Sequence, residues 1–420
     1  MQPVFLIGDI RLAKEILEKR SAKFSSRPTV PYIRYHVDPA QVYWAVLEQG
    51  ETNFIARRLT AGLMAGVRAG KTELLQQFEA LLTMAHLLDD GGKNWFNQMD
   101  RVSASMVLAA AFGLHCPTGQ EPELQEIIAC IAEFVRLCSP FASIINVLPV
   151  LDLVPGPMPW RKRAQTHRKR DGALYDKLIS RAVSGEASGM NTWAAVFASE
   201  DKPEGDQRRL MNQFTMAAIE TACTAVSMHN FILACILYPK WIPRAQREID
   251  TIVGEDRLPS FQDRSRLPYV EAIVRETLRW RPAARLGAPH QSTADDVVEY
   301  KGKEYFIPKG SVIFAVTWAI EHKQERFQNH DMFQPERFLD DTNHLKAGYE
   351  TSAFGYITAC PGIPFAERAL WINIAMILWT FNIRKSDEPD LTTGLPFQYD
   401  DSDLAFNGEA RNEIARRLYH

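Results

Sequence analysis

A cysteine followed by a proline and a glycine is the first feature of this sequence that could do chemistry. Cys360, Pro361 and Gly362 stand directly before a long apolar stretch, AERALWINIAMILW, which predicts a buried helix. Proline and glycine predict a tight turn whose N–H groups point at the sulfur, and a helix start stabilises negative charge. A thiolate held in this way suits a metal ligand better than a nucleophile, because no histidine near it in the sequence offers itself as a base. A purely structural loop cysteine is the alternative.

An acid and an alcohol interrupt a second apolar helix, which we expect at about residues 208–238. Glu220 and Thr221 stand in the middle of it, in the stretch MAAIETACTA. A buried carboxylate is costly unless it is solvated or paired. We interpret the two side chains as a carboxylate and a hydroxyl that pass protons into a cavity. A helix that merely faces a water-filled cleft is the alternative.

A third feature is a pair of opposite charges three residues apart in VRETLRW. Glu276 and Arg279 share a helix face at this spacing and can form an ion pair. An ordinary surface pair is one interpretation. The apolar residues around it favour a partly buried pair, which needs further partners to offset its desolvation. Arg337, in the segment PERF, is the candidate third member.

The hydrophobic pattern of the remaining sequence predicts a mostly helical protein with a small β region in its second half. We expect the last 35 or so residues to be polar loops. The other expected segments are a strand at 4–9, a helix at 10–24, helical sequence at 41–114 with a break at 89–94, helices at 123–138, 161–183, 239–253 and 267–280, a loop at 155–160, and hairpin strands within 297–316.

Composition sets limits on the class of protein. The 420 residues are 46% hydrophobic and 24% charged, which suffices for a large core, and the net charge of −3 argues against a nucleic-acid binder. The six cysteines form no CxxC pair, which favours a reducing compartment without disulfides. Gly66–Thr72, GVRAGKT, only resembles a phosphate-binding loop, because three residues rather than four separate its glycines. We find neither a signal peptide nor an apolar run long enough to span a membrane.

Taken together and in this order, these pieces resemble the cytochrome P-450 superfamily of haem-thiolate monooxygenases. The family's acid–alcohol helix matches AAIET, its Glu-x-x-Arg helix matches ETLR, and its PERF segment and Cys-Pro-Gly turn match as written. The resemblance covers nearly the whole chain and is similar in style to fungal microsomal members, often found in secondary metabolism. It implies a mainly α cytochrome P-450 fold, with a large helical domain and a small β region. Residues 1–420 would form one domain, with the haem-binding core at about 205–385.

The resemblance also implies roles for individual residues. Cys360 would be the axial thiolate ligand of the iron of haem b, which favours O–O cleavage. Glu220 and Thr221 would deliver protons for the reaction. The remaining implied residues contact the cofactor or form a structural ion triad: Arg57 and His290 at the haem propionates, Phe354 and Gly362 in the haem loop, Ala218 in the oxygen groove, and the triad of Glu276, Arg279 and Arg337.

Several positions depart from the family pattern. Thr358 stands where the haem loop has an arginine, and Phe354 lies one place too close to Cys360. Asn53 replaces a tryptophan and Ala218 a glycine. Because a hydrogen bond from a charged donor contributes roughly 1.5–3 kcal/mol, we expect weakened haem binding. The sequence also starts late, without the family's membrane anchor, proline hinge and first helix.

The implied function is insertion of one oxygen atom from O2 into an apolar small molecule. Electrons would come from NADPH through a cytochrome P-450 reductase. Two alternatives stay open: a haem-thiolate cyclase, isomerase or peroxide-dependent enzyme, and a degenerate relic that binds haem poorly. The resemblance implies the endoplasmic reticulum surface, while the absence of an anchor leaves a cytoplasmic or peripherally bound protein open. We expect pocket walls at Ile33–Val46, Pro140–Val154 and Ala284–Ala288.

Overall fold

The structure is a computed structural model, and the present description covers only part of the chain. The described residues are 2–28, 30–39, 43, 46–137, 142–184, 192–198, 223–349, 351–356, 360–385 and 406–410.

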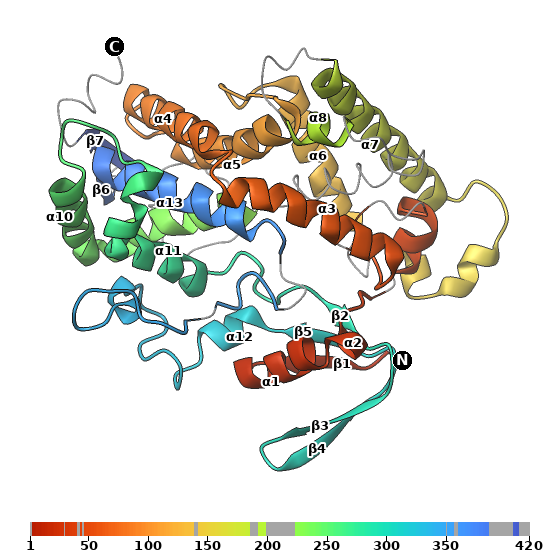
Figure 1. Cartoon of the computed structure of the whole chain (residues 1–420). Coiled ribbons are helices and arrows are strands. Elements are labelled where there is room, and N and C mark those ends of the chain that lie inside the picture. Colours follow the sequence, from red (N-terminus) through yellow and green to blue (C-terminus); the bar gives the residue numbers. More distant parts are fainter. Residues whose placement is uncertain are drawn as a thin grey trace.

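Helices make up most of the described chain, as the sequence predicts. Figure 1 shows a helical body with the small β region and α1 and α2 beneath it. The helices are α1 (Ile10–Lys14), α2 (Ser21–Phe24), α3 (Glu51–Arg68), α4 (Glu73–Asp89), α5 (Trp95–Phe112), α6 (Pro122–Leu137), α7 (Pro159–Val183), α8 (Trp193–Ala198), a helix at 223–237, α10 (Ile242–Ile252), α11 (Pro268–Trp280), α12 (Thr317–Glu321) and α13 (Ile363–Thr380).

Short 3₁₀ and π turns connect several of these helices. The ones that the argument uses are η2 (Ile33–Val37), η4 (Ile144–Asn146), η5 (Pro149–Leu153) and η8 (Pro335–Phe338).

The most buried element is α13, the apolar helix that follows Cys360. Its side chains are buried on all faces from Ala369 to Thr380, with Trp371 and Trp379 fully enclosed. It packs against α3, α4, α10 and α11, and Figure 1 shows it running through the helical body. A helix that is apolar all round needs such a position, because no face of it is suited to water. The predicted buried helix is confirmed.

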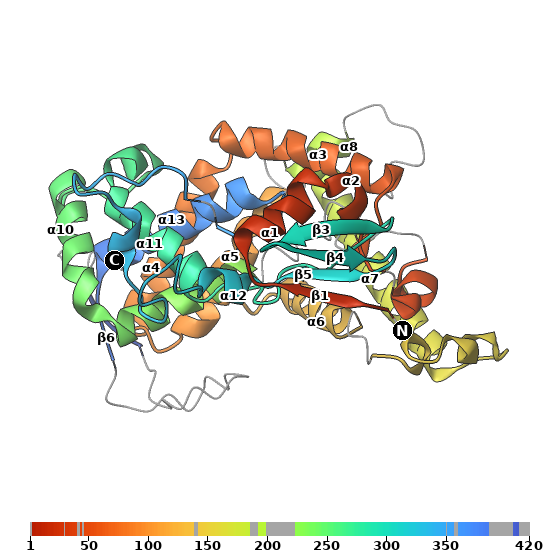
Figure 2. The same cartoon turned by 90° about the horizontal axis from the view of Figure 1, so that it is seen from below.

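Two separate sheets form the β region near the N-terminus. β1 (Val4–Ile7) pairs in parallel with β5 (Val312–Ala315), which pairs on its other edge with β2 (His290–Gln291). β3 (Asp296–Tyr300) and β4 (Lys303–Ile307) form a hairpin that extends below the body in Figure 1 and overlaps the rest of the molecule in the view from below in Figure 2. Its turn residues Lys301 and Gly302 both have positive φ, as two-residue hairpin turns require.

The structure corrects the sequence prediction in several places. The turn before β5 does not make a second hairpin, because both edges of β5 are already taken by β1 and β2. The helical sequence expected from residue 41 begins only at Glu51, and it has a further break around Gly70, whose φ of +84° ends the helix. In the polar tail, 406–410 form β7, which pairs with β6 (Phe381–Lys385). The loop expected at 155–160 ends at Met158, where α7 begins.

GVRAGKT covers the end of α3 and the turn that leads to α4. A phosphate-binding loop would follow a strand, so this position agrees with its dismissal. Among the described residues, no helix combines the length and the apolar character that crossing a bilayer requires.

One glycine fixes the close approach of two β-region segments. Gly287 follows α11 with φ of +71°, and a Cβ built there would lie 2.5 Å from the carbonyl oxygen of Ala315 at the end of β5. A side chain at 287 would push these two segments apart.

We therefore expect Gly287→Ala to lower the free energy of unfolding by about 2 kcal/mol or more, through left-handed backbone strain and the clash with Ala315. Gly172→Ala is the matched control, because its Cβ meets nothing within 4 Å inside α7. The control should stabilise the protein by roughly 0.5–1 kcal/mol. Denaturant unfolding measures both, and equal effects of the two variants would contradict the prediction.

Candidate active site

A cavity of about 240 Å³ lies where the helical body meets the β region. Its walls come from the helix at 223–237, the end of α11 and the segment after it, β5, the 352–356 loop and the start of α13. Most of the lining is apolar or small, including Leu278, Ala284, Ala288 and Leu370. Pockets of this kind, with a few convergent polar groups, are the usual place for a ligand.

Cys360 lies in the cavity wall, directly before α13. Its amide donates to the carbonyl oxygen of Phe354 at 2.8 Å, and the amide of Ile363 lies 3.4 Å from the Cys360 carbonyl. The predicted tight turn is therefore present, with Gly362 as the N-cap of α13. These two amides bond to carbonyl oxygens rather than to the sulfur. The start of α13 and the charge of Arg57 favour negative charge on the sulfur.

Arg57 is the cation whose charge interacts with Cys360. Burial lowers the pKa of Arg57, and the negative charge of Cys360 raises it, with burial the larger effect. Asn53, one turn earlier in α3, accepts a hydrogen bond from Arg57 Nε at 3.1 Å and donates to the carbonyl oxygen of Leu47 at 3.3 Å. The residue that replaces the family's tryptophan thus orients Arg57.

His290 is buried in the cavity wall at the start of β2. Its Nδ1 lies 2.9 Å from the carbonyl oxygen of Phe24, and since a carbonyl can only accept, this nitrogen donates. Burial, together with the charges of Arg27 and Arg57, lowers the pKa of His290 to about 3. The imidazole is therefore neutral at physiological pH.

Arg27 is a cavity residue that the sequence analysis missed. It is only 7% exposed, and its Nη1 donates to the carbonyl oxygen of Pro289 at 2.8 Å. Burial and the charge of Arg57 lower its pKa to about 10. In the described part of the chain no carboxylate forms an ion pair with it. In the sequence its segment, SSRPTVP, reads only as a helix break.

The arrangement suits a planar ligand with acidic groups. Arg27 and the half-buried Arg57 form a cationic cluster beside the neutral His290, and charges withdrawn from water need a counter-charge. Cys360 offers a thiolate on the wall of the same cavity, and the other walls are apolar. An iron porphyrin carries a metal, an apolar ring and two carboxylates, so the residues present fit it.

The pair Glu276–Arg279 is fully buried, so the alternative of a surface pair is wrong. Arg279 Nε and Nη2 donate to the two oxygens of Glu276 at 2.6 and 2.9 Å, and Arg337 Nε donates at 3.1 Å. The amide of Gln334 adds a fourth bond at 2.8 Å. The structure thus brings the three predicted residues together and ties α11 to η8.

Several sequence predictions lie outside the described residues: Ala218, Glu220, Thr221 and Thr358. The described helix that follows Thr221 in the sequence starts at Cys223, and Cys223, Thr224 and Ser227 line the cavity.

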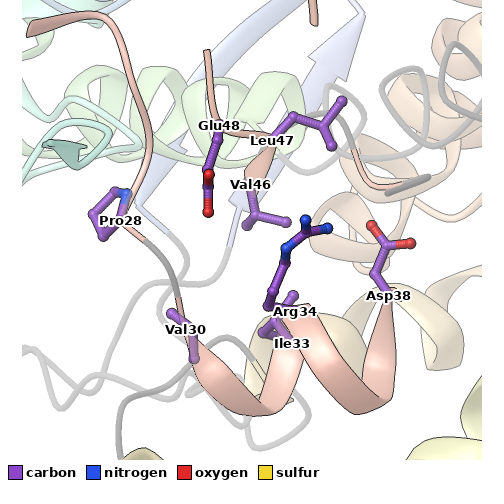
Figure 3. A pocket seen from close by; sticks show the side chains of 8 residues that line it. All are labelled: Pro28, Val30, Ile33, Arg34, Asp38, Val46, Leu47 and Glu48. Carbon is purple, nitrogen blue, oxygen red and sulfur yellow. The ribbon is translucent and has the colours of Figure 1, made fainter. Parts of the chain in front are cut away.

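The three segments expected to form pocket walls lie in different places relative to the cavity. Ala284, Gly287 and Ala288 line the cavity. Ile33–Val46 contributes instead to a small separate pocket of about 30 Å³, where Figure 3 shows Arg34 reaching from η2 toward Val46. No described residue of Pro140–Val154 lines the cavity.

Comparison with known proteins agrees with this geometry. The family model described as cytochrome P450 matches residues 1–397. Cytochrome P450 monooxygenase verL of Clonostachys rogersoniana is 32% identical over 90% of this chain and 72% of its own length. Cytochrome P450 monooxygenases drtD of Aspergillus calidoustus and peniB of Penicillium patulum are 31% and 30% identical, each over 92% of this chain and 72% and 71% of their own.

The chain belongs to the cytochrome P450 family. The fold, mainly helical with small sheets, agrees with that family. It is an oxidoreductase of the haem monooxygenase type, and the family's cofactor is haem b bound through a cysteine thiolate. Members of the family take electrons from a redox partner and act on small molecules.

Arg27 gives a test of the cationic cluster. We expect Arg27→Met to weaken haem affinity roughly tenfold to a hundredfold, because one charged donor to the acidic groups is lost. The haem-free protein should change in stability by less than about 1 kcal/mol, because the lost bond to Pro289 is offset by the removed repulsion from Arg57.

Haem titration and denaturant unfolding measure the two effects separately. Arg11→Met is the control, since the Arg11 side chain is 85% exposed and should change neither quantity. Unchanged haem affinity in Arg27→Met would remove Arg27 from the haem site.

Proposed function

We propose that Cys360 is the axial ligand of the haem iron, and that Arg57, His290 and Arg27 hold the haem propionates. The observation that supports this most strongly is the placement of Cys360, Arg27 and His290 around one mostly apolar cavity, with Arg57 close enough for its charge to interact with Cys360. Phe354 and Gly362 shape the loop on either side of the sulfur, and Ala218 would face the oxygen-binding groove.

When bound, the haem supplies the activation of O2, and the protein supplies the environment for it. The Cys360 thiolate donates electron density to the iron. The apolar lining excludes water and accommodates an apolar substrate. Glu220 and Thr221 would hold and pass protons into the cavity. The described helix at 223–237 begins two residues after Thr221, and its residues Cys223 and Thr224 line the cavity, which supports the assignment.

The substrate we propose is an apolar small molecule of secondary metabolism, into which one oxygen atom is inserted. NADPH would supply electrons through a cytochrome P450 reductase. The small side chains of Ala283, Ala284 and Ala288 leave room for such a molecule beside the haem.

The cysteine ligand is tested by the spectrum of the reduced, carbon-monoxide-bound protein. The wild type should show the red-shifted Soret band of a thiolate ligand, and Cys360→Ser should lose it. Cys223→Ser is the matched control, because Cys223 also lines the cavity and should leave the band unchanged. A Cys360→Ser variant with the wild-type band would refute the ligand assignment.

Haem reconstitution, and an assay without NADPH and reductase, separate the alternatives that the altered haem loop raises. A wild-type chain that takes up no haem on reconstitution would be a degenerate relic. A chain with the thiolate band that converts its substrate without NADPH and reductase would be a cyclase, isomerase or peroxide-dependent enzyme.

We also propose that the segment at η4 and η5 contacts a membrane surface. Six of its apolar side chains are strongly exposed: Ile144, Val147, Leu148, Val150, Leu153 and Val154. The helix that follows, α7, presents exposed cations, including Lys162, Arg168 and Lys169. Apolar side chains beside basic ones suit a surface of anionic lipid. A chain bound to the endoplasmic reticulum surface in this way would lie on the same membrane as a cytochrome P450 reductase.

Leu153→Glu is expected to weaken binding to vesicles of mixed zwitterionic and anionic phospholipid roughly tenfold, since one apolar side chain no longer enters the lipid. Leu74→Glu on α4 is the control, because Leu74 is 82% exposed and Leu153 81%. Vesicle co-sedimentation measures both. An equal loss in the two variants would point to general charge repulsion and refute the proposed surface.

A further inference from the structure

A buried glutamate lies behind the cysteine loop and belongs to none of the motifs described above. Glu321 is the last residue of α12 and is fully buried. Its Oε1 accepts two hydrogen bonds from Ser352, from the amide and from Oγ, each at 2.7 Å. Hydrogen bonds to a buried carboxylate are among the stronger contacts in a protein, so they hold Ser352 firmly.

Ser352 begins the loop that forms the wall of the cavity next to Cys360. It is 2% exposed, and its carbonyl accepts from the amide of Gly355 at 3.1 Å. Phe354, between them, accepts from the amide of Cys360 at 2.8 Å. Ser352 and the residues from Ala353 to Tyr356 all line the cavity. The carboxylate of Glu321 is therefore connected to the backbone of Cys360 through Ser352 and the Phe354 carbonyl.

The other side of Glu321 is joined to the buried ion triad. Its carbonyl oxygen accepts from Arg279 Nη1 at 3.0 Å, and its Oε2 pairs with Arg326 Nη1 at 3.2 Å. Glu276, in turn, holds Arg279 through two bonds. Contacts therefore run from the triad through Glu321 to the loop. Glu321 contacts the triad through its carbonyl oxygen and the loop through its carboxylate.

The negative charge of Glu321 affects Tyr349, which precedes the 352–356 loop, and Tyr356, which ends it. Burial raises the pKa of Tyr349 and of Tyr356, and in each case the negative charge of Glu321 is the next largest cause. Tyr349 precedes the loop and Tyr356 lines the cavity. The carboxylate therefore lies close to the whole of this segment.

We propose that Glu321 is a positioning residue for the cysteine ligand: its carboxylate fixes Ser352, and through the Phe354 carbonyl it fixes the backbone of Cys360. The inference rests on the proposed function, in which Cys360 binds the haem iron. The haem loop of this chain lacks the family's arginine, and the contact between Glu321 and Ser352 helps to fix the loop in its place.

The test compares four full-length variants loaded with haem. Glu321→Ala should lower the fraction of reduced, carbon-monoxide-bound protein with the thiolate Soret band, and should release haem about tenfold faster, because both charged hydrogen bonds are lost. Ser352→Ala removes only the Oγ bond and keeps the amide bond, so it should change both quantities in the same direction by a smaller factor. The double variant should be no worse than Glu321→Ala, since the bond that Ser352→Ala removes is already absent without the carboxylate. Glu325→Ala, at an exposed glutamate one turn further on, is the control and should behave as wild type.

Glu321→Gln separates positioning from a general effect on stability. Its amide oxygen still accepts both bonds from Ser352, while its charge toward Arg326 is gone. We expect it to keep most of the thiolate band. A Gln variant as poor as the Ala variant would assign the effect to the Arg326 ion pair and overturn the proposal. Wild-type spectra and haem release in Ser352→Ala would also overturn it, and this variant decides the matter if Glu321→Ala does not fold.

Failure of the proposed function has a different signature. If the wild-type chain takes up no haem, the ligand assignment fails. The contact is then measured in the haem-free protein by the rate at which iodoacetamide alkylates Cys360, read by mass spectrometry of its peptide. Glu321→Ala and Ser352→Ala should both change that rate relative to Glu325→Ala. Equal rates in all three would overturn the positioning role.

Discussion

Burial of the Glu276 carboxylate is the constraint on which the cavity depends. A charge removed from water must have its oxygens satisfied, and Glu276 does so with two arginines and the amide of Gln334. These bonds lock the end of α11 to η8. The segment that leaves α11 forms one wall of the cavity, and Arg279 extends the network to Glu321 behind the opposite wall. One buried acid therefore fixes the distance between two walls.

Positive charge is concentrated near the cavity, on Arg27 and Arg57. Arg27 and Arg57 both add to the effect of burial in lowering the pKa of His290, and the charge of Arg57 also lowers the pKa of Arg27. Clusters of groups with perturbed pKa values are typical of functional sites. In the proposed site the acidic groups of haem would provide the compensating negative charge, which would make the cofactor a structural component of the protein as well as its reactive centre.

The sequence predicts the features that depend on local spacing. The buried helix after Cys360 follows from its apolar composition, and Glu276 and Arg279 follow from their separation of three residues. The sequence does not predict contacts between segments that are far apart along the chain. Arg27 is recognisable only when folding brings it next to Arg57, and the partner of β5 is a strand from the other end of the chain. Glu321 and Ser352 likewise belong to no shared motif, and only their meeting in space gives either a role.

The single hydrogen bond from His290 to Phe24 has a thermodynamic consequence. Because Nδ1 carries its proton toward the Phe24 carbonyl, Nε2 is the nitrogen left for a ligand, and in the neutral ring it has no proton to donate. To pair with a haem carboxylate, the ring must take up a proton as the cofactor binds. Linkage then requires the affinity for haem to increase as the solution becomes more acidic, over the interval between the free pKa of about 3 and the higher value in the complex. Assembly of the holoprotein would thus consume a hydrogen ion.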